Sequence, residues 1–391
     1  MGGVGLTAAQ EQYVARVRAV ATHHLAGIPP VHGAVNRPLV AALGEHGLLR
    51  GLFGGAPDEP VVTLGEAAAL QLCLLRETLA SVTTEAETAL ALQGLGSYPI
   101  LQSGSPAAVE RWIPGVVDGS VVAAFALSEP GAGSDAAALS LEASADGDGW
   151  RLHGEKAWIS NAPEADVYTV FARTTDGAGA RGVTAFVVPG DAAGLGGEPL
   201  DLLAPHAIGT LVFDGVRVSA DDVLGEVDQG FAVAMRTLDL FRPSVGAFAV
   251  GMAQAALDAA LDWALTREVY GDLLIRQQSV EHTLAEMATR TEAARLLVRS
   301  AATSYDSGAP AAQVTQSAAM AKLFATENAQ WVVDQAVQLH GARGLQQGHL
   351  LERLYREVRA PRIYEGASEV QRTIIGRGLV RAHESRQEGQ S

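Results

Sequence analysis

The sequence has a single cysteine, Cys73, and fewer basic than acidic residues. One cysteine cannot form a disulfide framework or a cysteine-based metal site within one chain. The 28 lysines and arginines against 44 aspartates and glutamates give a formal net charge of −16. Because phosphate binding requires a basic surface, this charge argues against DNA or RNA as the main partner.

Long apolar runs are also missing. No uninterrupted run approaches the roughly 18 residues that a membrane span needs, so we expect no span. The first residues lack the basic and then apolar layout of a signal peptide. With 48% hydrophobic and 18% charged residues, the chain can nevertheless bury large cores. We therefore expect a soluble, cytoplasmic protein in a reducing compartment.

Several generic catalytic motifs are absent as well. The ten histidines are scattered, and no His-Glu-x-x-His or clustered carboxylate pattern occurs, so no metal site is expected. A Gly-x-Ser-x-Gly motif of serine hydrolases is not found either. The segment Gly131-Ala-Gly133-Ser-Asp-Ala136 matches a dinucleotide-binding fingerprint, but turns and short strands follow it from 139 to 160. Because that fingerprint opens a helix, we do not expect a Rossmann site.

The residue pattern divides the chain into three zones. Residues 7–113 read as helical, and Thr7 with Gln10 has the spacing of a helix capping box. From 121 to 226, short β-branched and aromatic runs alternate with glycine and aspartate turns. From 229 onward apolar residues recur at helical spacing. Helix, then strand, then helix predicts an α+β fold. The predicted domains are an N-terminal helical domain at 1–120, a central β-domain at 121–228 and a C-terminal helical bundle at 229–391.

Four segments of the sequence are more informative about function than the composition is. They are Ala126-Leu-Ser-Glu-Pro-Gly-Ala-Gly-Ser-Asp135, Gly154-Glu-Lys-Ala-Trp-Ile-Ser-Asn-Ala162, Arg267-Glu-Val-Tyr-Gly271 and Ile363-Tyr-Glu-Gly-Ala-Ser-Glu-Val-Gln-Arg372. In this order and at these separations they resemble the signatures of the acyl-CoA dehydrogenase family. Arg76-Glu77 agrees more loosely. The resemblance implies an N-terminal helical domain, a central β-barrel-like domain and a C-terminal four-helix bundle, assembled as a homodimer or homotetramer.

Glu365 can also be read from its own surroundings. It lies in the largely apolar segment 363–366, ahead of a predicted final helix in which Ser368 and Gln371 have capping-box spacing. Desolvation in such a junction raises the pKa of a carboxylate, which suits a base that takes a proton from carbon. Taken alone, the segment also fits an exposed glutamate ahead of a helix N-terminus. The family resemblance implies that Glu365 is the catalytic base.

The resemblance further implies FAD as the cofactor and assigns residues to it and to the substrate. Those implied in FAD binding are Leu127, Ser128, Gly133, Trp158, Ser160, Arg267, Tyr270, Gln278, Gln338, Gly341, Ala367 and Glu369. Those implied in substrate binding are Ser134, Asp239, Arg242, Tyr364 and Gly366. Arg267, Gln338 and Gly341 would contact the FAD of a neighbouring subunit. On spacing alone, Asp239 and Arg242 predict an ion pair along a helix.

The implied reaction is the α,β-dehydrogenation of an acyl thioester to the trans-2-enoyl thioester. Glu365 would remove the α proton while the β carbon delivers hydride to flavin N5, and an electron-transferring flavoprotein would accept the electrons. Three alternatives stay open: an acyl-carrier-protein substrate in place of acyl-CoA, an oxygen-using relative (an acyl-CoA oxidase or a flavin monooxygenase), and an inactive scaffold of the same fold. The sequence does not define the length or branching of the acyl chain.

Overall fold

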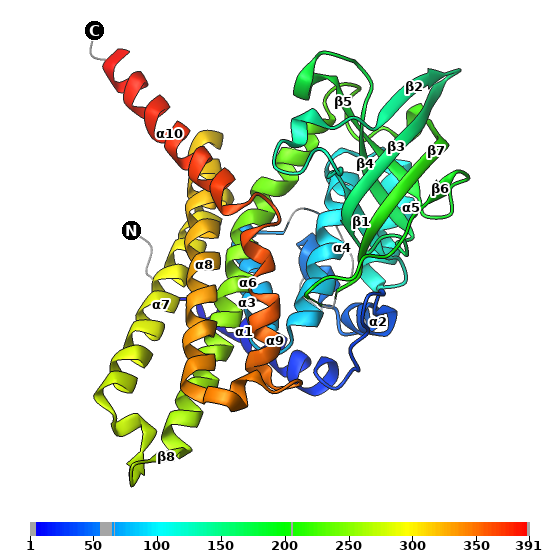
Figure 1. The fold of residues 1–391 in the computed structure, drawn as a ribbon. Helices are drawn as coiled ribbons and strands as arrows, with labels where there is room; N and C mark the ends of the chain where they lie inside the picture. The colour runs from blue at the N-terminus through cyan, green and yellow to red at the C-terminus, as the bar shows by residue number, and fades with distance from the viewer. Residues whose placement is uncertain (1–4, 55–64, 66, 205, 389–391) are drawn as a thin grey trace. The chain divides into compact units, whose positions relative to one another are not determined.

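The computed structural model describes residues 5–54, 65, 67–204 and 206–388 (Figure 1). Residue contacts divide the chain into two compact units. Unit 1 comprises Met1–Ala19, Ala68–Thr84 and Asp239–Ser391, and unit 2 comprises Val20–Ala67 and Glu85–Leu238. The predicted domain boundaries after 120 and 228 stay a prediction.

Unit 1 is built from helices, apart from a two-stranded hairpin. Its helices are α1 (Ala8–Val20), α3 (Ala69–Ala80), α6 (Gly230–Thr266, whose first turns fall in unit 2), α7 (Gln278–Asp306), α8 (Ala311–His340), α9 (Leu350–Glu357) and α10 (Ser368–Glu388). The hairpin pairs β8 (Glu268–Val269) with β9 (Asp272–Leu273). At the start of α1, Thr7 N donates to Gln10 Oε1 at 2.9 Å and Gln10 N donates to Thr7 Oγ1 at 3.3 Å. These two bonds confirm the predicted capping box.

Two glycines let α6 approach its neighbours closely. A Cβ added at Gly246 would meet the side chain of Val298 on α7, and one added at Gly251 would overlap the carbonyl oxygen of Glu77 on α3. Because helix axes can come this near only where side chains are absent, these glycines set the spacing around α6. Helices α3, α6, α7 and α8 supply much of the buried apolar core of unit 1.

Replacing Gly251 by alanine should therefore destabilise the fold. The new methyl would push against backbone on α3, and such overpacking costs about 1–3 kcal/mol. Gly376 on α10 is a matched control because a Cβ there meets nothing within 4 Å. Gly376→Ala should stabilise by about 0.5–1 kcal/mol, since alanine is the better helix former. Urea unfolding of both variants checks this, and equal effects would contradict it.

Helix α6 corrects the expectation about apolar stretches. By length and composition it is the one described helix that could cross a membrane, with a mean hydropathy of 1.4 over its best 18-residue window. Scattered polar residues hide this window from a search for unbroken runs. However, 72% of the window is buried inside the protein, as in the core helix of a water-soluble fold.

Unit 2 carries three described α-helices and a curled, mixed sheet (Figure 1). The helices are α2 (Arg37–Glu45), α4 (Thr84–Ser103) and α5 (Pro106–Asp118). The strands are β1 (Ala123–Ala126), β2 (Glu142–Asp146), β3 (Gly149–Ser160), β4 (Val167–Arg173), β5 (Val183–Pro189), β6 (Leu195–Gly196) and β7 (Ile208–Ser219). They are hydrogen-bonded in the order β1-β4-β2-β3-β7-β6, and β5 pairs with β4. The predicted α+β plan with helical ends and a central sheet is confirmed.

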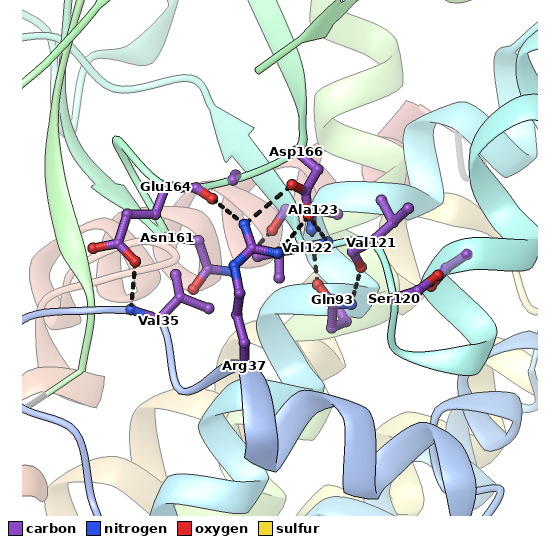
Figure 2. A network of polar contacts seen from close by, with 12 residues as sticks. Val35, Arg37, Gln93, Ser120, Val121, Val122, Ala123, Asn161, Glu164 and Asp166 are labelled. Carbon is purple, nitrogen blue, oxygen red and sulfur yellow. Dashed lines mark hydrogen bonds and ion pairs between the residues drawn. The ribbon is translucent and has the colours of Figure 1, made fainter. Parts of the chain in front are cut away.

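A polar network fixes the start of β1, as Figure 2 shows. The Arg37 guanidinium donates to both carboxylate oxygens of Asp166, at 2.9 and 3.1 Å. Asp166 in turn accepts from Val122 N at 2.7 Å. Gln93 on α4 accepts from Ala123 N at 2.8 Å and donates to Val121 O at 2.7 Å. Because β1 runs directly into residues 127–135, this network also fixes where that loop begins.

The glycine-rich segment after β1 does not open an α-helix. Residues 131–135 form a loop that leads into a short 3₁₀ turn at Ala136–Ala138, and β2 follows. The prediction that this segment is not a Rossmann fingerprint is thereby confirmed.

Candidate active site

The segment that carries Glu365 has a tightly defined backbone. Glu365 has a φ of 50° and Gly366 a φ of 93°, so a non-glycine residue adopts the left-handed conformation. Lys322 Nζ on α8 donates to Tyr364 O at 3.0 Å and to Gly366 O at 2.7 Å. Gln371 Nε2 donates to Gly366 O at 2.9 Å. The carbonyls on both sides of Glu365 are thus held by buried donors, which offsets the cost of the unusual φ.

The carboxylate of Glu365 is desolvated. Its Oε2 atom is buried and has no hydrogen-bond partner in the part of the chain that the structure describes. Burial raises the pKa of Glu365, while the charges of Arg76, Lys322 and Arg242 oppose the rise. Because a buried carboxylate oxygen without a donor is costly, this environment favours the protonated form of the side chain. This agrees with the expected desolvation of Glu365.

The two arginines near Glu365 are themselves held in place. Arg76 on α3 is buried and donates to Ser244 Oγ at 2.6 Å. Arg242 on α6 pairs with Asp239 at 3.1 Å, which confirms the predicted ion pair. Burial raises the pKa of Asp239, while Arg242 opposes this. The cations around Glu365 therefore come from α3, α6 and α8 and have fixed positions.

The predicted capping box at the start of α10 is wrong. The Ser368 hydroxyl donates to Glu327 on α8 at 2.6 Å, and Gln371 reaches back to the carbonyl of Gly366. Glu327 also pairs with Arg362 at 2.8 Å. A carboxylate supplied by another helix thus takes the hydroxyl that the local pattern assigns to the helix terminus. Together with the bonds from Lys322, these contacts hold residues 362–368, which we call the base segment after the predicted role of Glu365, against α8 at both ends.

In unit 2, a buried ion pair holds the loop that follows β1. Lys156 on β3 is fully buried and donates to Glu129 Oε1 at 2.8 Å and to Leu127 O at 3.0 Å. Glu129 also accepts from Ser140 N and Oγ and from Leu141 N. Burial alone would raise the pKa of Glu129, but Lys156 and these donors lower it. These hydrogen bonds therefore fix the loop from its buried side.

The outer side of this loop is open. Gly133 and Ser134 are exposed, and a Cβ added at Gly133 would meet no atom within 4 Å. Trp158 on β3 has a φ of 61° at an irregularity in the pairing with β7, and its side chain is 55% exposed. Packing within the chain does not demand glycine at 133 or bury the indole at 158. Both features suit a ligand with a large flat ring that lies against unit 2.

A third group of predicted residues lies at the C-terminal ends of α6 and α8. The Arg267 guanidinium lies 5.7 Å from the Trp263 ring, whose Nε1 donates to Leu339 O at 3.1 Å. Arg343 lies 5.2 Å from the same ring. Trp263 thus brings Arg267 beside the turn that carries Gln338 and Gly341. The remaining two, Tyr270 and Gln278, are exposed at the hairpin and at the start of α7.

These residues fit FAD in chemical terms. The ring would find an exposed indole, a hydroxyl at Ser128 or Ser160 and an open loop backbone, and the pyrophosphate would find the Arg267 guanidinium. The exposure of Arg267, Gln338 and Tyr270 is what binding to a neighbouring subunit's cofactor requires. The assignment of each residue stays a prediction.

The structure also gives roles to residues that the sequence analysis did not single out, two of them inside the quoted motifs. Lys322, Lys156 and Glu129 are the buried groups that hold the two loops, and Arg343 adds a second cation at Trp263. One signal was present in the sequence, since Lys156 and Lys322 are its only two lysines. Two of the residues predicted to bind FAD have ordinary surroundings. Ala367 is half-buried two positions after Glu365, and Glu369 is exposed and pairs with Arg372.

Breaking the buried pair in unit 2 should be costly. Glu129→Gln leaves the Lys156 charge buried without its partner, and such a loss costs about 3–5 kcal/mol. Since the pKa of Glu129 is lowered on folding, its contribution is present above the ordinary value near 4.5 and is lost as pH falls below it. Urea unfolding at neutral and acidic pH should show the gap between wild type and variant closing in acid. A gap independent of pH would contradict this account.

Comparison with known proteins agrees with the fold and the motifs. Family models match the chain in three parts: the acyl-CoA dehydrogenase N-terminal domain at residues 7–120, the middle domain at 124–216 and the C-terminal domain at 228–380. The chain belongs to the acyl-CoA dehydrogenase family. It is therefore an FAD-dependent oxidoreductase that acts on acyl-CoA.

Individual relatives support this placement. The chain is 37% identical to cyclohexane-1-carbonyl-CoA dehydrogenase of Geobacter metallireducens over 84% of each chain. It is 42% identical to the mitochondrial short-chain specific acyl-CoA dehydrogenase of Bos taurus over 73% of this chain and 70% of the relative. Among solved structures, butyryl-CoA dehydrogenase from Megasphaera elsdenii is 33% identical with a TM-score of 0.88, covering 96% of this chain and 99% of that one.

Proposed function

We propose that the chain oxidises the α,β bond of an acyl-CoA with Glu365 as the base that removes the α proton. The observation that carries the proposal is the buried, unpartnered Oε2 of Glu365 among three fixed cations. A proton on carbon is weakly acidic, so its acceptor must be desolvated and correctly placed. A surface carboxylate would meet neither condition.

Different groups around Glu365 have different roles in the proposed reaction. The fixed 364–366 backbone orients the carboxylate. Among the described residues the peptide N–H of Glu365 donates to no backbone carbonyl, so it would be free to polarise the thioester carbonyl. Arg76, Arg242 and Lys322 favour the ionised form before the reaction, while burial favours the protonated form after it. The three cations thus limit the rise in the pKa of Glu365 that burial causes.

When bound, FAD supplies the acceptor for the hydride that leaves the β carbon. We infer that Arg267, Gln338 and Gly341 act on a neighbouring subunit's FAD. The other residues that we infer to hold FAD are Leu127, Ser128, Gly133, Trp158, Ser160, Tyr270, Gln278, Ala367 and Glu369. Ser134, Asp239, Arg242, Tyr364 and Gly366 are the proposed substrate contacts. Glu365 takes the α proton, bound FAD would take the hydride, and the trans-2-enoyl thioester is the product.

The setting of the reaction is part of the same proposal. The exposure of Arg267 and of Gln338 and Gly341 supports assembly as a homodimer or homotetramer, in which a neighbouring subunit uses them. The proposed location is the cytoplasm. An electron-transferring flavoprotein is the proposed electron acceptor. The named relatives act on cyclic and on short acyl groups, so short and cyclic acyl-CoAs are the first substrates to test.

Removing the base should stop turnover without removing the flavin. Glu365→Gln should lower kcat about 10²- to 10⁴-fold, the usual contribution of a general base. Anaerobic titration of the yellow protein with straight, branched and cyclic acyl-CoAs reads this as loss of flavin bleaching. Glu110→Gln, an exposed glutamate on α5, is the control. Bleaching by Glu365→Gln at the wild-type rate would contradict the assignment.

The Arg267 assignment is tested by flavin affinity. Arg267→Ala should weaken FAD binding about 10- to 100-fold, because a charge-assisted hydrogen bond contributes about 1.5–3 kcal/mol. Arg111→Ala is a matched control, since Arg111 also stacks on a tryptophan, at 4.5 Å from the Trp112 ring. Titration of the apoprotein with FAD measures both. Equal affinities would remove Arg267 from the cofactor site.

A further inference from the structure

Lysine is almost absent from this chain. Of its 28 lysines and arginines only Lys156 and Lys322 are lysine. Both side chains are fully buried, and both donate to backbone carbonyls of a loop in the candidate site. A chain that uses arginine at every other basic position therefore keeps lysine at two buried places where it serves a loop.

The geometry around Lys322 explains why lysine is needed there. Its Nζ bonds Tyr364 O and Gly366 O, the two carbonyls that flank Glu365. In the described part of the chain, no carboxylate forms an ion pair with it. An ammonium is a compact charge whose three donors can meet carbonyls from different directions, whereas a guanidinium is a planar fork suited to carboxylates. A guanidinium is also bulkier, so replacing Lys322 by arginine would shift the two carbonyls that it bonds.

We propose that Lys322 is a positioning residue for the base: it fixes the left-handed turn at Glu365, and its buried charge favours the ionised carboxylate. This inference rests on the proposed role of Glu365 and deepens it. Lys322 itself touches neither proton nor hydride in this account. It acts through the two peptide groups that define where the carboxylate lies.

The charged groups on every neighbouring helix are consistent with this role. Arg76 from α3 and Arg242 from α6 also face Glu365, but they hydrogen-bond Ser244 and Asp239. Burial lowers the pKa of Lys322 to about 8, against the effect of Glu365. The charge of Arg242 lowers the pKa of Lys322 further, and the charges of Glu327 and Glu369 raise it. Because Lys322 and Glu365 stabilise each other's charge, neutralising either one must shift the titration of the other.

Lys156 supplies an internal reference. It is equally buried, and burial lowers its pKa to about 8 as well. Its partner is Glu129, at 2.8 Å in unit 2. A change at Glu365 should therefore move the titration of Lys322 and leave that of Lys156 alone.

The first test reads this coupling without turnover. Holoenzyme labelled with ¹³C at the lysine ε carbon gives only two lysine signals, and Lys322→Arg assigns them. In Glu365→Gln, the titration midpoint of the Lys322 signal should fall to lower pH while that of Lys156 stays. An unmoved Lys322 midpoint, or equal movement of both signals, would overturn the inference.

The second test separates charge from geometry. Lys322→Met should lower kcat about 10²-fold, the cost of a base misplaced by about 1 Å, with little change in KM. It should also move the acidic limb of the kcat/KM profile to higher pH, because Glu365 loses a stabilising charge. Lys322→Arg should lose kcat but keep the acidic limb.

Thr326→Val is the matched control for disturbance of α8. Thr326 is buried one helical turn after Lys322. Its hydroxyl donates to the backbone carbonyl of Lys322 and not to the base segment. This variant should keep both kcat and the pH profile. A Lys322→Met enzyme with the wild-type profile and kcat would overturn the inference.

Failure of the inference and failure of the proposed function give different results. A Glu365→Gln enzyme that still dehydrogenates acyl-CoA contradicts the base role, while the two lysine signals still decide whether Lys322 and Glu365 are coupled. Loss of dehydrogenation together with an unmoved Lys322 signal contradicts only the positioning role.

Discussion

The burial of the Glu365 carboxylate is the constraint on which unit 1 depends. An ionised carboxylate removed from water is costly unless other charges or donors offset the loss of hydration. Arg76, Arg242 and Lys322 provide that offset from three different helices, and each is held by a further contact. The close helix crossings at Gly246 and Gly251 bring α3, α6, α7 and α8 near enough for these side chains to converge. The packing of these helices therefore also determines which charges surround Glu365.

Both candidate loops are held from behind by a buried ammonium. Lys156 fixes the loop after β1 through Leu127 and Glu129, and Lys322 fixes the segment around Glu365. In each case the ammonium bonds backbone carbonyls on the buried side of the loop. The opposite side differs: the first loop exposes backbone and a hydroxyl, and the second retains an unpartnered carboxylate oxygen. Rigid support on one side and unused polar groups on the other is the arrangement that preorganised sites require.

Patterns that depend on neighbouring residues were predictable from the sequence, and those that depend on distant partners were not. The Thr7–Gln10 box and the Asp239–Arg242 pair formed as expected because both partners lie within one helical turn. The Ser368 box failed because Glu327, 41 positions earlier, takes the hydroxyl. No local pattern indicates that Lys322 reaches the carbonyls around Glu365. The family motifs pointed to the segment around Glu365, whereas the contacts that support this segment became visible only in three dimensions.

The central claim is that Glu365 removes a proton from the α carbon, and isotope exchange tests it directly. An acyl-CoA whose β carbon is replaced by sulfur cannot lose hydride, so proton removal alone can be followed in D₂O. The account predicts that the wild-type holoenzyme incorporates deuterium at the α carbon and that Glu365→Gln does so only at the rate of the uncatalysed reaction. Exchange by the Glu365→Gln variant at the wild-type rate would contradict it.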